Sequence, residues 1–347
     1  MDSTIFLFLV QDGVINGAIY ALVGIALVLV FAITRVIFVP QGHYIAFAAF
    51  SIQALEQGRF PQTASLLVVL GALTVVATMV FHWKTLTFIR CAKIILFYVG
   101  LPIVLVALTY WLAPKKLSSP AAIALTLALI IPMGPMIYRI AFEPLQRASI
   151  LVLLIAALGV HFSLQGLALI FYGPEGIGAQ PLLDASFSIG ELVVTGQSLA
   201  VLATTSLCIA IFGIVFERTL VGKALRACAS NRLGARLVGI APVVTGQLAF
   251  ALAAGLGAVS GILIASIITI YYDSGFMIGL KAFVAAIIGG LVSYPGVVIA
   301  AVAVGLAEAF FSFWASNLKE VLVFTLLIPF LFWRSLYTPH VEEEEEQ

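Results

Sequence analysis

The fold is decided by the stretch Glu217–Ile240, ERTLVGKALRACASNRLGARLVGI, which lies between two strongly apolar segments. It contains five of the chain's 17 Lys and Arg residues, namely Arg218, Lys223, Arg226, Arg232 and Arg236. A basic block of this kind is too polar for lipid and is typical of a cytoplasmic loop between membrane spans. The chain on both sides of the block is therefore expected to cross a membrane.

The interior of this stretch predicts two short amphipathic helices at the membrane surface. Apolar and small residues recur at near-helical spacing, with Ser230-Asn231 as the expected turn and Gly239 as the expected C-cap. Spacing alone leaves two interpretations open. The block is either a docking element for a partner or a positively charged anchor that has no partner.

Composition places the chain among helical membrane proteins. Its mean hydropathy is +1.18, with 63% hydrophobic and 10% charged residues. The net charge of +1 does not indicate a nucleic-acid partner. The three cysteines are scattered and suggest neither a disulfide framework nor a metal site. Gly222-Lys223 is followed by Ala224, so no phosphate-binding loop is present and any nucleotide is expected on a partner.

The predicted fold is an all-α polytopic membrane protein. A span needs about 20 apolar residues, and fewer where the helix is broken. Residues 1–340 are expected to form one transmembrane domain, and the Glu-rich residues 341–347 a disordered acidic tail. The sequence contains eleven apolar segments, three of them short (42–57, 280–293 and 320–333): 12–33, 42–57, 64–82, 94–113, 121–138, 150–172, 196–217, 245–270, 280–293, 296–316 and 320–333.

The distribution of charge predicts the orientation. With the N-terminus outside and every segment crossing, twelve Lys and Arg residues fall inside and five outside, in agreement with the positive-inside rule. The long connection 173–195 has three acidic residues and no Lys or Arg, as an external loop should. The C-terminus is then inside. The residues assigned to the outside are Arg59, Lys115, Lys116, Lys281 and Lys319.

The basic stretch resembles the cytoplasmic loop of ABC importer permeases of the branched-chain amino acid (Liv-type) group. That family has a Thr-x-x-Gly-x-x-x-Arg-Ala-x-Ala pattern followed by Ala-x-x-x-Gly-Ile, and the resemblance implies that the loop docks on an ATPase subunit. The residues that carry the match, and the coupling role it implies, are Thr219, Gly222, Arg226, Ala227, Ala229, Ala235, Gly239 and Ile240.

The first segment and its exit, NGAIYALVGIALVLVFAITRVIFVPQGH, also resemble the opening of these permeases. The chain departs from the pattern after Ile37. Pro40 is expected to end a helix, so residues 34–44 predict a break at membrane depth, either lining a pathway or forming an ordinary turn. The candidate pathway residues here are Asn16, Tyr20, Gln41 and His43.

The last third, GLKAFVAAIIGGLVSYPGVVIAAVAVGLAE, is similar to the family nearly throughout. Gly289 and Gly290 allow close backbone approach, and the following Tyr294-Pro295-Gly296 ends a short helix, as transporter pathways often require. A small-residue packing face is the other interpretation. Glu308 lies deep in a span and needs a partner or a polar cavity, with subunit packing and transport both open.

Segment 150–172 contains His161 near its centre, with Gln165 one helical turn later on the same face. Both are candidates for the pathway, although a lone buried histidine is more often a hydrogen-bonded structural group. Residues 60–138 fit the family poorly. They are expected to contain an inserted helical pair that packs peripherally against lipid.

The resemblance implies a permease subunit of an ABC importer in the bacterial inner membrane, with no catalytic residue, metal or cofactor of its own. The implied partners are a second permease subunit, two cytoplasmic ATPase subunits that bind ATP and Mg, and an external solute-binding protein. The implied solute is a branched-chain amino acid or a related small amino acid or amide. An ion-coupled secondary transporter is the alternative, and it would need more ionisable residues in the bundle. An intramembrane enzyme is disfavoured because no paired catalytic set is present.

Overall fold

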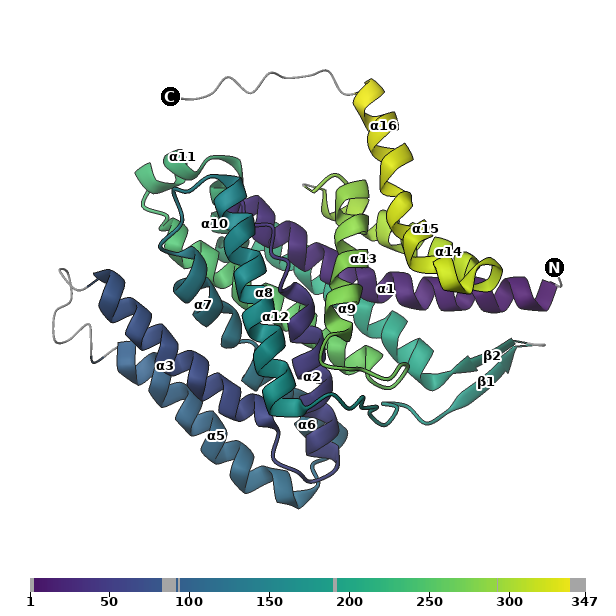
Figure 1. Ribbon diagram of the computed structural model, residues 1–347, viewed down its shortest axis with the longest axis horizontal. Helices are drawn as coiled ribbons and strands as arrows, with labels where there is room; N and C mark the ends of the chain where they lie inside the picture. Colours follow the sequence, from purple (N-terminus) through teal and green to yellow (C-terminus); the bar gives the residue numbers. More distant parts are fainter. Residues whose placement is uncertain (1–2, 83–91, 93, 190–191, 292, 338–347) are drawn as a thin grey trace.

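The computed structural model describes residues 3–82, 92, 94–189, 192–291 and 293–337. Within these ranges the chain is almost entirely helical, which confirms the predicted all-α polytopic fold (Figure 1). The unexpected element is an antiparallel hairpin, β1 Ser186–Ile189 with β2 Leu192–Thr195, in the connection assigned to the outside. The acidic tail 341–347 and residues 83–91 of the expected insertion lie outside the described residues.

The helices follow the predicted apolar segments. Eight helical stretches in the described ranges are long and apolar enough to cross a membrane, and the three segments marked as short give the shorter helices α2, α13 and the pair α15–α16. The helices are α1 Ser3–Thr34, α2 Gln41–Glu56, α3 Gln62–His82, α5 Leu101–Leu112, α6 Ser119–Ile130, α7 Met133–Ile137, α8 Ile150–Tyr172, α9 Gly196–Arg218, α10 Leu220–Ser230, α11 Arg232–Leu237, α12 Pro242–Ile264, α13 Ser274–Ile288, α14 Tyr294–Trp314, α15 Lys319–Thr325 and α16 Leu327–Tyr337. Single π-helical turns, η2 Leu96–Gly100 and η4 Tyr138–Phe142, precede α5 and follow α7.

The centre of the bundle is built on α1, which runs across the molecule in Figure 1 and packs against α12, α13 and α14. The short helix α2 lies between α12 and α13 and also contacts α6 and α8. Thirteen of its sixteen residues are buried. A helix too short to cross a membrane is therefore enclosed by protein, which keeps its polar side chains away from lipid.

The break between α1 and α2 is present, but Pro40 has a different role from the one expected. The proline stands at the N-cap of α2 and begins that helix, where a missing N–H costs nothing because the first N–H groups have no partner. The end of α1 is set instead by Arg35, whose φ of 61° is left-handed. Val36 and Phe38 are buried, so the break is covered by protein.

The 60–138 region divides into a peripheral part and a central part. Helices α3 and α5 lie side by side at one edge of the molecule (Figure 1). Helix α5 exposes most of its apolar side chains, as expected for lipid contact. In contrast, α6 packs against α2 and α12 inside the bundle. Helices α3 and α5 thus lie where a peripheral helical pair is expected, and α6 belongs to the bundle.

Two helix ends differ from the prediction around residue 270. Helix α12 ends at Ile264, and Ile270 then pairs with Ile177 through two backbone hydrogen bonds of 2.9 and 2.8 Å. Helix α13 begins at Ser274, six residues before the predicted segment. Lys281 is therefore buried within α13 and does not lie in an external connection. The prediction that counted it among the five Lys and Arg residues outside is wrong for this residue.

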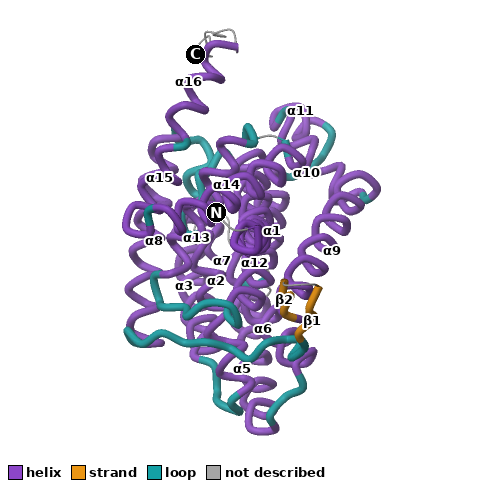
Figure 2. Tube along the Cα trace, turned by 90° about the vertical axis from the view of Figure 1, so that its right-hand side faces the viewer, coloured by secondary structure: helices purple, strands orange, loops and turns teal. Residues whose placement is uncertain are grey.

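Connections that were assigned to the same side of the membrane lie together. The backbone N–H of Gln180 donates to Glu56, and the Ser266 hydroxyl donates to the Gln180 carbonyl at 2.7 Å. Gln180 lies in the connection 173–195, which is assigned to the outside, and Glu56 and Ser266 lie near the ends of the predicted segments 42–57 and 245–270 that face the same side. In Figure 2 the hairpin lies toward one end of the molecule, and α10 and α11 lie toward the other. The hairpin connection and the α10–α11 element, which the charge distribution assigns to opposite sides, are thus separated in the structure.

Candidate functional site

Helices α10 and α11 form a compact element beyond the end of α9 (Figure 2). Each helix begins with a side-chain cap. The Thr219 hydroxyl accepts from the Gly222 N–H at 3.0 Å, and the Asn231 side-chain oxygen accepts from the Gly234 N–H at 2.8 Å. Such caps satisfy N–H groups that the helix leaves unpaired. The two short helices and the turn at Ser230-Asn231 are therefore as the sequence predicts.

The end of α11 is fixed by Gly239. Its φ is 85°, its N–H donates to the Arg236 carbonyl at 3.1 Å, and the next N–H, of Ile240, donates to the Ala235 carbonyl at 2.9 Å. This pair of bonds is the Schellman arrangement, which glycine adopts without steric cost. The exit of the chain from α11 toward α12 is thereby set in one direction.

One face of this element packs on the bundle. Gly222, Leu225 and Cys228 of α10 and Ala235 of α11 are buried, and Ala227 is half-buried. A Cβ on Gly222 would overlap the carbonyl oxygen of Val215 in α9. The small size of Gly222 is therefore required inside this chain.

The opposite face is exposed and combines apolar with basic side chains. Leu220 and Leu237 are each 82% exposed, although neither lies in a candidate span. An exposed apolar surface rimmed by charge marks an interaction site. We define the α10–α11 face as Leu220, Leu233, Leu237 and Val238 with the exposed basic residues Lys223 and Arg226.

A second group of predicted residues meets inside the bundle. The Tyr20 hydroxyl donates to Oε2 of Glu308 at 2.5 Å, and Nζ of Lys281 donates to Oε1 at 2.5 Å. Lys281 also lies 3.9 Å from Glu320 of α15. Glu308 therefore has the partners that a buried carboxylate requires, and the group joins α1, α13, α14 and α15. The sequence analysis did not predict that Lys281 joins Glu308 and Tyr20, although Lys281 lies in the apolar GLKAF stretch that matches the family.

His43 and His161 form a third group. Nε2 of His43 and Nδ1 of His161 are 2.9 Å apart and share a hydrogen bond between α2 and α8. The ring of Phe276 from α13 lies over His161, with centroids 4.4 Å apart. Gln165 is half-buried one turn further along α8. Two imidazoles alone do not make a metal centre, and the described ranges contain no group of three or more potential ligands.

The remaining pathway candidates lie elsewhere. Gln41 is buried and donates to the Ala253 carbonyl at 2.8 Å, which ties α2 to α12. Asn16 lines a cleft of about 770 Å³ between α1 and the hairpin connection. Gly289 packs against Val297, and Gly290 follows with a φ of 92°. Tyr294 lies against the rings of Phe212 and Phe216 in α9. The candidates are thus distributed over several places and do not line one cavity.

Taken together, eight candidate spans, a buried broken region and an exposed basic element define a polytopic helical membrane protein of the transport class. The family model for the branched-chain amino acid transport system permease component matches residues 9–331, and the chain belongs to that family. This finding confirms the resemblance read from the basic stretch and from the first and last segments.

Individual relatives agree with the family assignment. The chain is 30% identical over 233 residues to the high-affinity branched-chain amino acid transport system permease protein BraD of Pseudomonas aeruginosa, covering 64% of this chain and 76% of BraD. It is 32% identical over 204 residues to the corresponding protein LivH of Escherichia coli K12, covering 56% of this chain and 66% of LivH. LivH of Salmonella typhimurium matches to the same extent. No solved structure matches the chain.

Proposed function

We propose that this permease subunit belongs to an ATP-driven importer and that its α10–α11 face docks on a cytoplasmic ATPase subunit. The observation that supports this proposal is that α10 and α11 have one face packed on the bundle and an opposite face that is exposed. One face is packed into the bundle through Gly222 and Leu225, and the other exposes Leu220, Leu237 and Arg226. The positive-inside rule accounts for the basic residues alone, whereas the large exposed leucines require a further apolar surface to contact, and a groove of an ATPase subunit would supply one.

The rest of the proposed assembly follows from the family. A second permease subunit would complete the pathway, two ATPase subunits would bind ATP and Mg, and a solute-binding protein would deliver the solute from outside. The relatives are named for branched-chain amino acid transport, so the proposed solute is a branched-chain amino acid or a related small amino acid or amide. The proposed location is the bacterial inner membrane, with the N-terminus outside and the C-terminus inside.

The proposed mechanism is alternating access driven by the ATPase subunits. Helix α10 contacts α9, α1 and α12 directly, so a displacement of α10 acts on three long helices at once. Its contact with α9 at Gly222 leaves no space for α10 to move independently of that helix. Closure of the ATPase subunits would therefore rock the bundle and change the side to which a central cavity opens.

The alternative of ion-coupled transport has less support. Its coupling site would have to use Glu308 or His161. Glu308 is already paired with Lys281 and Tyr20, and His161 is hydrogen-bonded to His43. Solute uptake into vesicles that contain the permease subunits and no ATPase would support the alternative and overturn the proposal.

The direct test uses two variants of the α10–α11 face in a reconstituted complex. Arg226→Glu reverses a charge at the proposed contact, which costs several kcal/mol when it is desolvated. Gly239→Val removes the left-handed conformation that ends α11. Each variant is expected to insert normally and to lower ATP hydrolysis stimulated by the loaded binding protein by more than about tenfold.

Arg59→Glu is the matched control, because Arg59 is an exposed arginine in a connection assigned to the outside. It should keep normal stimulation and normal co-purification of the ATPase subunits. Normal stimulation in both α10–α11 variants would mean that the basic element is only a topological anchor.

A further inference from the structure

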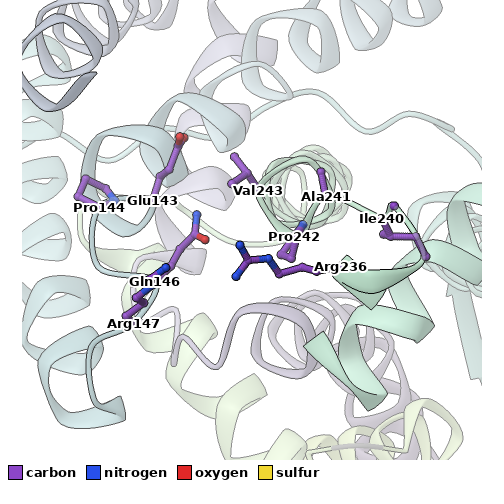
Figure 3. A pocket seen from close by; sticks show the side chains of 10 residues that line it. Glu143, Pro144, Gln146, Arg147, Arg236, Ile240, Ala241, Pro242 and Val243 are labelled. Carbon is purple, nitrogen blue, oxygen red and sulfur yellow. The ribbon is translucent and has the colours of Figure 1, made fainter. Parts of the chain in front are cut away.

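A cleft of about 630 Å³ opens beside the end of α11, between the 143–147 segment and the start of α12 (Figure 3). Two arginines, Arg147 and Arg236, contribute to opposite walls, and in Figure 3 Gln146 points toward Arg236. Neither arginine has an ion-pair partner among the described residues. The cleft thus presents two uncompensated guanidinium groups to one space.

The other charges in the wall do not cancel these arginines. The carboxylate of Glu143 lies 3.8 Å from Nε of Arg139, which counters its charge. Helix α12 begins in the same wall, and its N-cap Ala241 supplies no side-chain cap. The first N–H groups of this 23-residue helix therefore add to the positive potential in the cleft. This arrangement suits an anionic group with several acceptor oxygens.

The depth of the cleft indicates where that anion comes from. One candidate span ends at Phe142 and another begins at Pro242, so the cleft lies level with the lipid headgroups. Next to the lining residue Val243, α12 also exposes Val244 and Leu248, which are 53% and 37% exposed and lie one turn apart on a neighbouring face of the helix. A ligand that fits this surface has an anionic head and an apolar body.

We propose that this cleft binds an anionic phospholipid, with Arg147 and Arg236 clamping its phosphate and the acyl chains lying along α12. Basic pockets at the ends of membrane helices suit such headgroups, and guanidinium groups contact phosphate in a bidentate manner. The bound lipid would link the 143–147 segment to the α11–α12 turn at Gly239. Lipid composition would then influence how rigidly α11 is held against the bundle.

The test measures lipid binding by the full-length chain in detergent, so it needs neither an ATPase nor a solute. Phosphatidylglycerol and phosphatidylcholine are titrated against the wild type, Arg147→Gln/Arg236→Gln and the control Arg218→Gln/Lys223→Gln, with bound lipid counted by native mass spectrometry. The control removes two exposed cations from the same end of the molecule. Wild type and control should prefer phosphatidylglycerol by about tenfold or more, and the cleft variant should lose that preference.

Other outcomes would overturn the proposal. Equal loss in the control would show diffuse charge attraction and no site, and undiminished preference in the cleft variant would show that the lipid binds elsewhere. Displacement of phosphatidylglycerol by the same concentration of inorganic phosphate would make this a free-anion site. If the glutamine variant does not fold, Arg147→Lys/Arg236→Lys retains both charges but loses the planar fork, and it should bind phosphatidylglycerol more weakly than wild type.

Discussion

Helices α2 and α5 are both short and apolar, yet they have opposite environments. In α2 only three of sixteen residues reach the surface, although the helix carries Gln41 and His43. In α5 only Pro102 and Thr109 are buried, although almost every residue is apolar. Lipid is as apolar as a protein core, so hydrophobicity does not distinguish inside from outside in a membrane bundle. Polar and small residues mark the interior of this protein.

The hydrogen bonds of the two helices show the same difference. The polar side chains of α2 reach other elements: Gln41 bonds to α12 and His43 to α8. The Thr109 hydroxyl of α5 donates to the Leu105 carbonyl of its own helix. A helix whose polar side chains need hydrogen-bond partners on other helices must be enclosed by protein. A helix whose polar side chains bond to its own backbone can face lipid.

The largest effect is expected from breaking the buried ion pair of the interior. Lys281→Met leaves Glu308 charged and buried with only the Tyr20 hydroxyl as a partner. Removing one member of such a pair costs about 3–5 kcal/mol. The variant should lose most of its folded yield, measured by size-exclusion chromatography and thermal unfolding in detergent.

Its control is the double variant Lys281→Met/Glu308→Gln, which removes both charges and keeps an acceptor for Tyr20. This protein should recover most of the lost stability. If the single variant were as stable as wild type, the pair would not hold α13 and α14 together.

A smaller effect is expected from one methyl group, and it should depend on the helix that receives it. A Cβ on Gly42 in α2 would overlap the Gly275 carbonyl of α13, so the backbones must separate. A Cβ on Gly100, just before α5, meets only side-chain atoms of Leu96 at 3.3 Å. Gly42→Ala should destabilise by about 1–3 kcal/mol, whereas Gly100→Ala should change stability by less than about 0.5 kcal/mol. Thermal unfolding of the two variants side by side measures the difference, and equal shifts would contradict the contrast between the helices.

The smallest effect is expected at the exposed end of α5. Lys115 and Lys116 lie at the periphery, and Nζ of Lys115 is 3.1 Å from the ring centroid of Trp111. Lys115→Gln/Lys116→Gln removes an exposed cation–π contact of about 0.5–1 kcal/mol. Solute uptake by the reconstituted transporter should be unchanged. Loss of uptake at normal expression would mean that this edge of the molecule has a functional partner.

Local patterns in the sequence predicted the parts of the site that depend on near neighbours. The turn at Ser230-Asn231 and the C-cap at Gly239 were predicted, because each depends on residues within four positions of itself. The His43–His161 bond was not predictable, since its members are 118 residues apart. Lys281 was misplaced for the same reason, because its partner Glu308 is 27 residues away and a count of charges ignores pairing.

Hydropathy located the helices but not all of their ends. Residues 265–270 are apolar enough to extend α12, and yet Ile270 pairs with the backbone of Ile177. Apolar backbone covered by protein can be extended as well as helical, and composition does not separate the two. Pro40 was misread because proline is compatible with the start of a helix as well as with its end.

The enclosure of α2 has a consequence for how the protein is made. The carbonyl that accepts the Gln41 hydrogen bond belongs to Ala253, 212 residues later in the chain. At a synthesis rate of about 5–20 residues per second, the ribosome needs about 10–40 s to reach that partner. Throughout that interval α2 has left the ribosome with a polar side chain that lipid does not accommodate. Its final burial is therefore a late event in biogenesis, although it is the second helix to emerge.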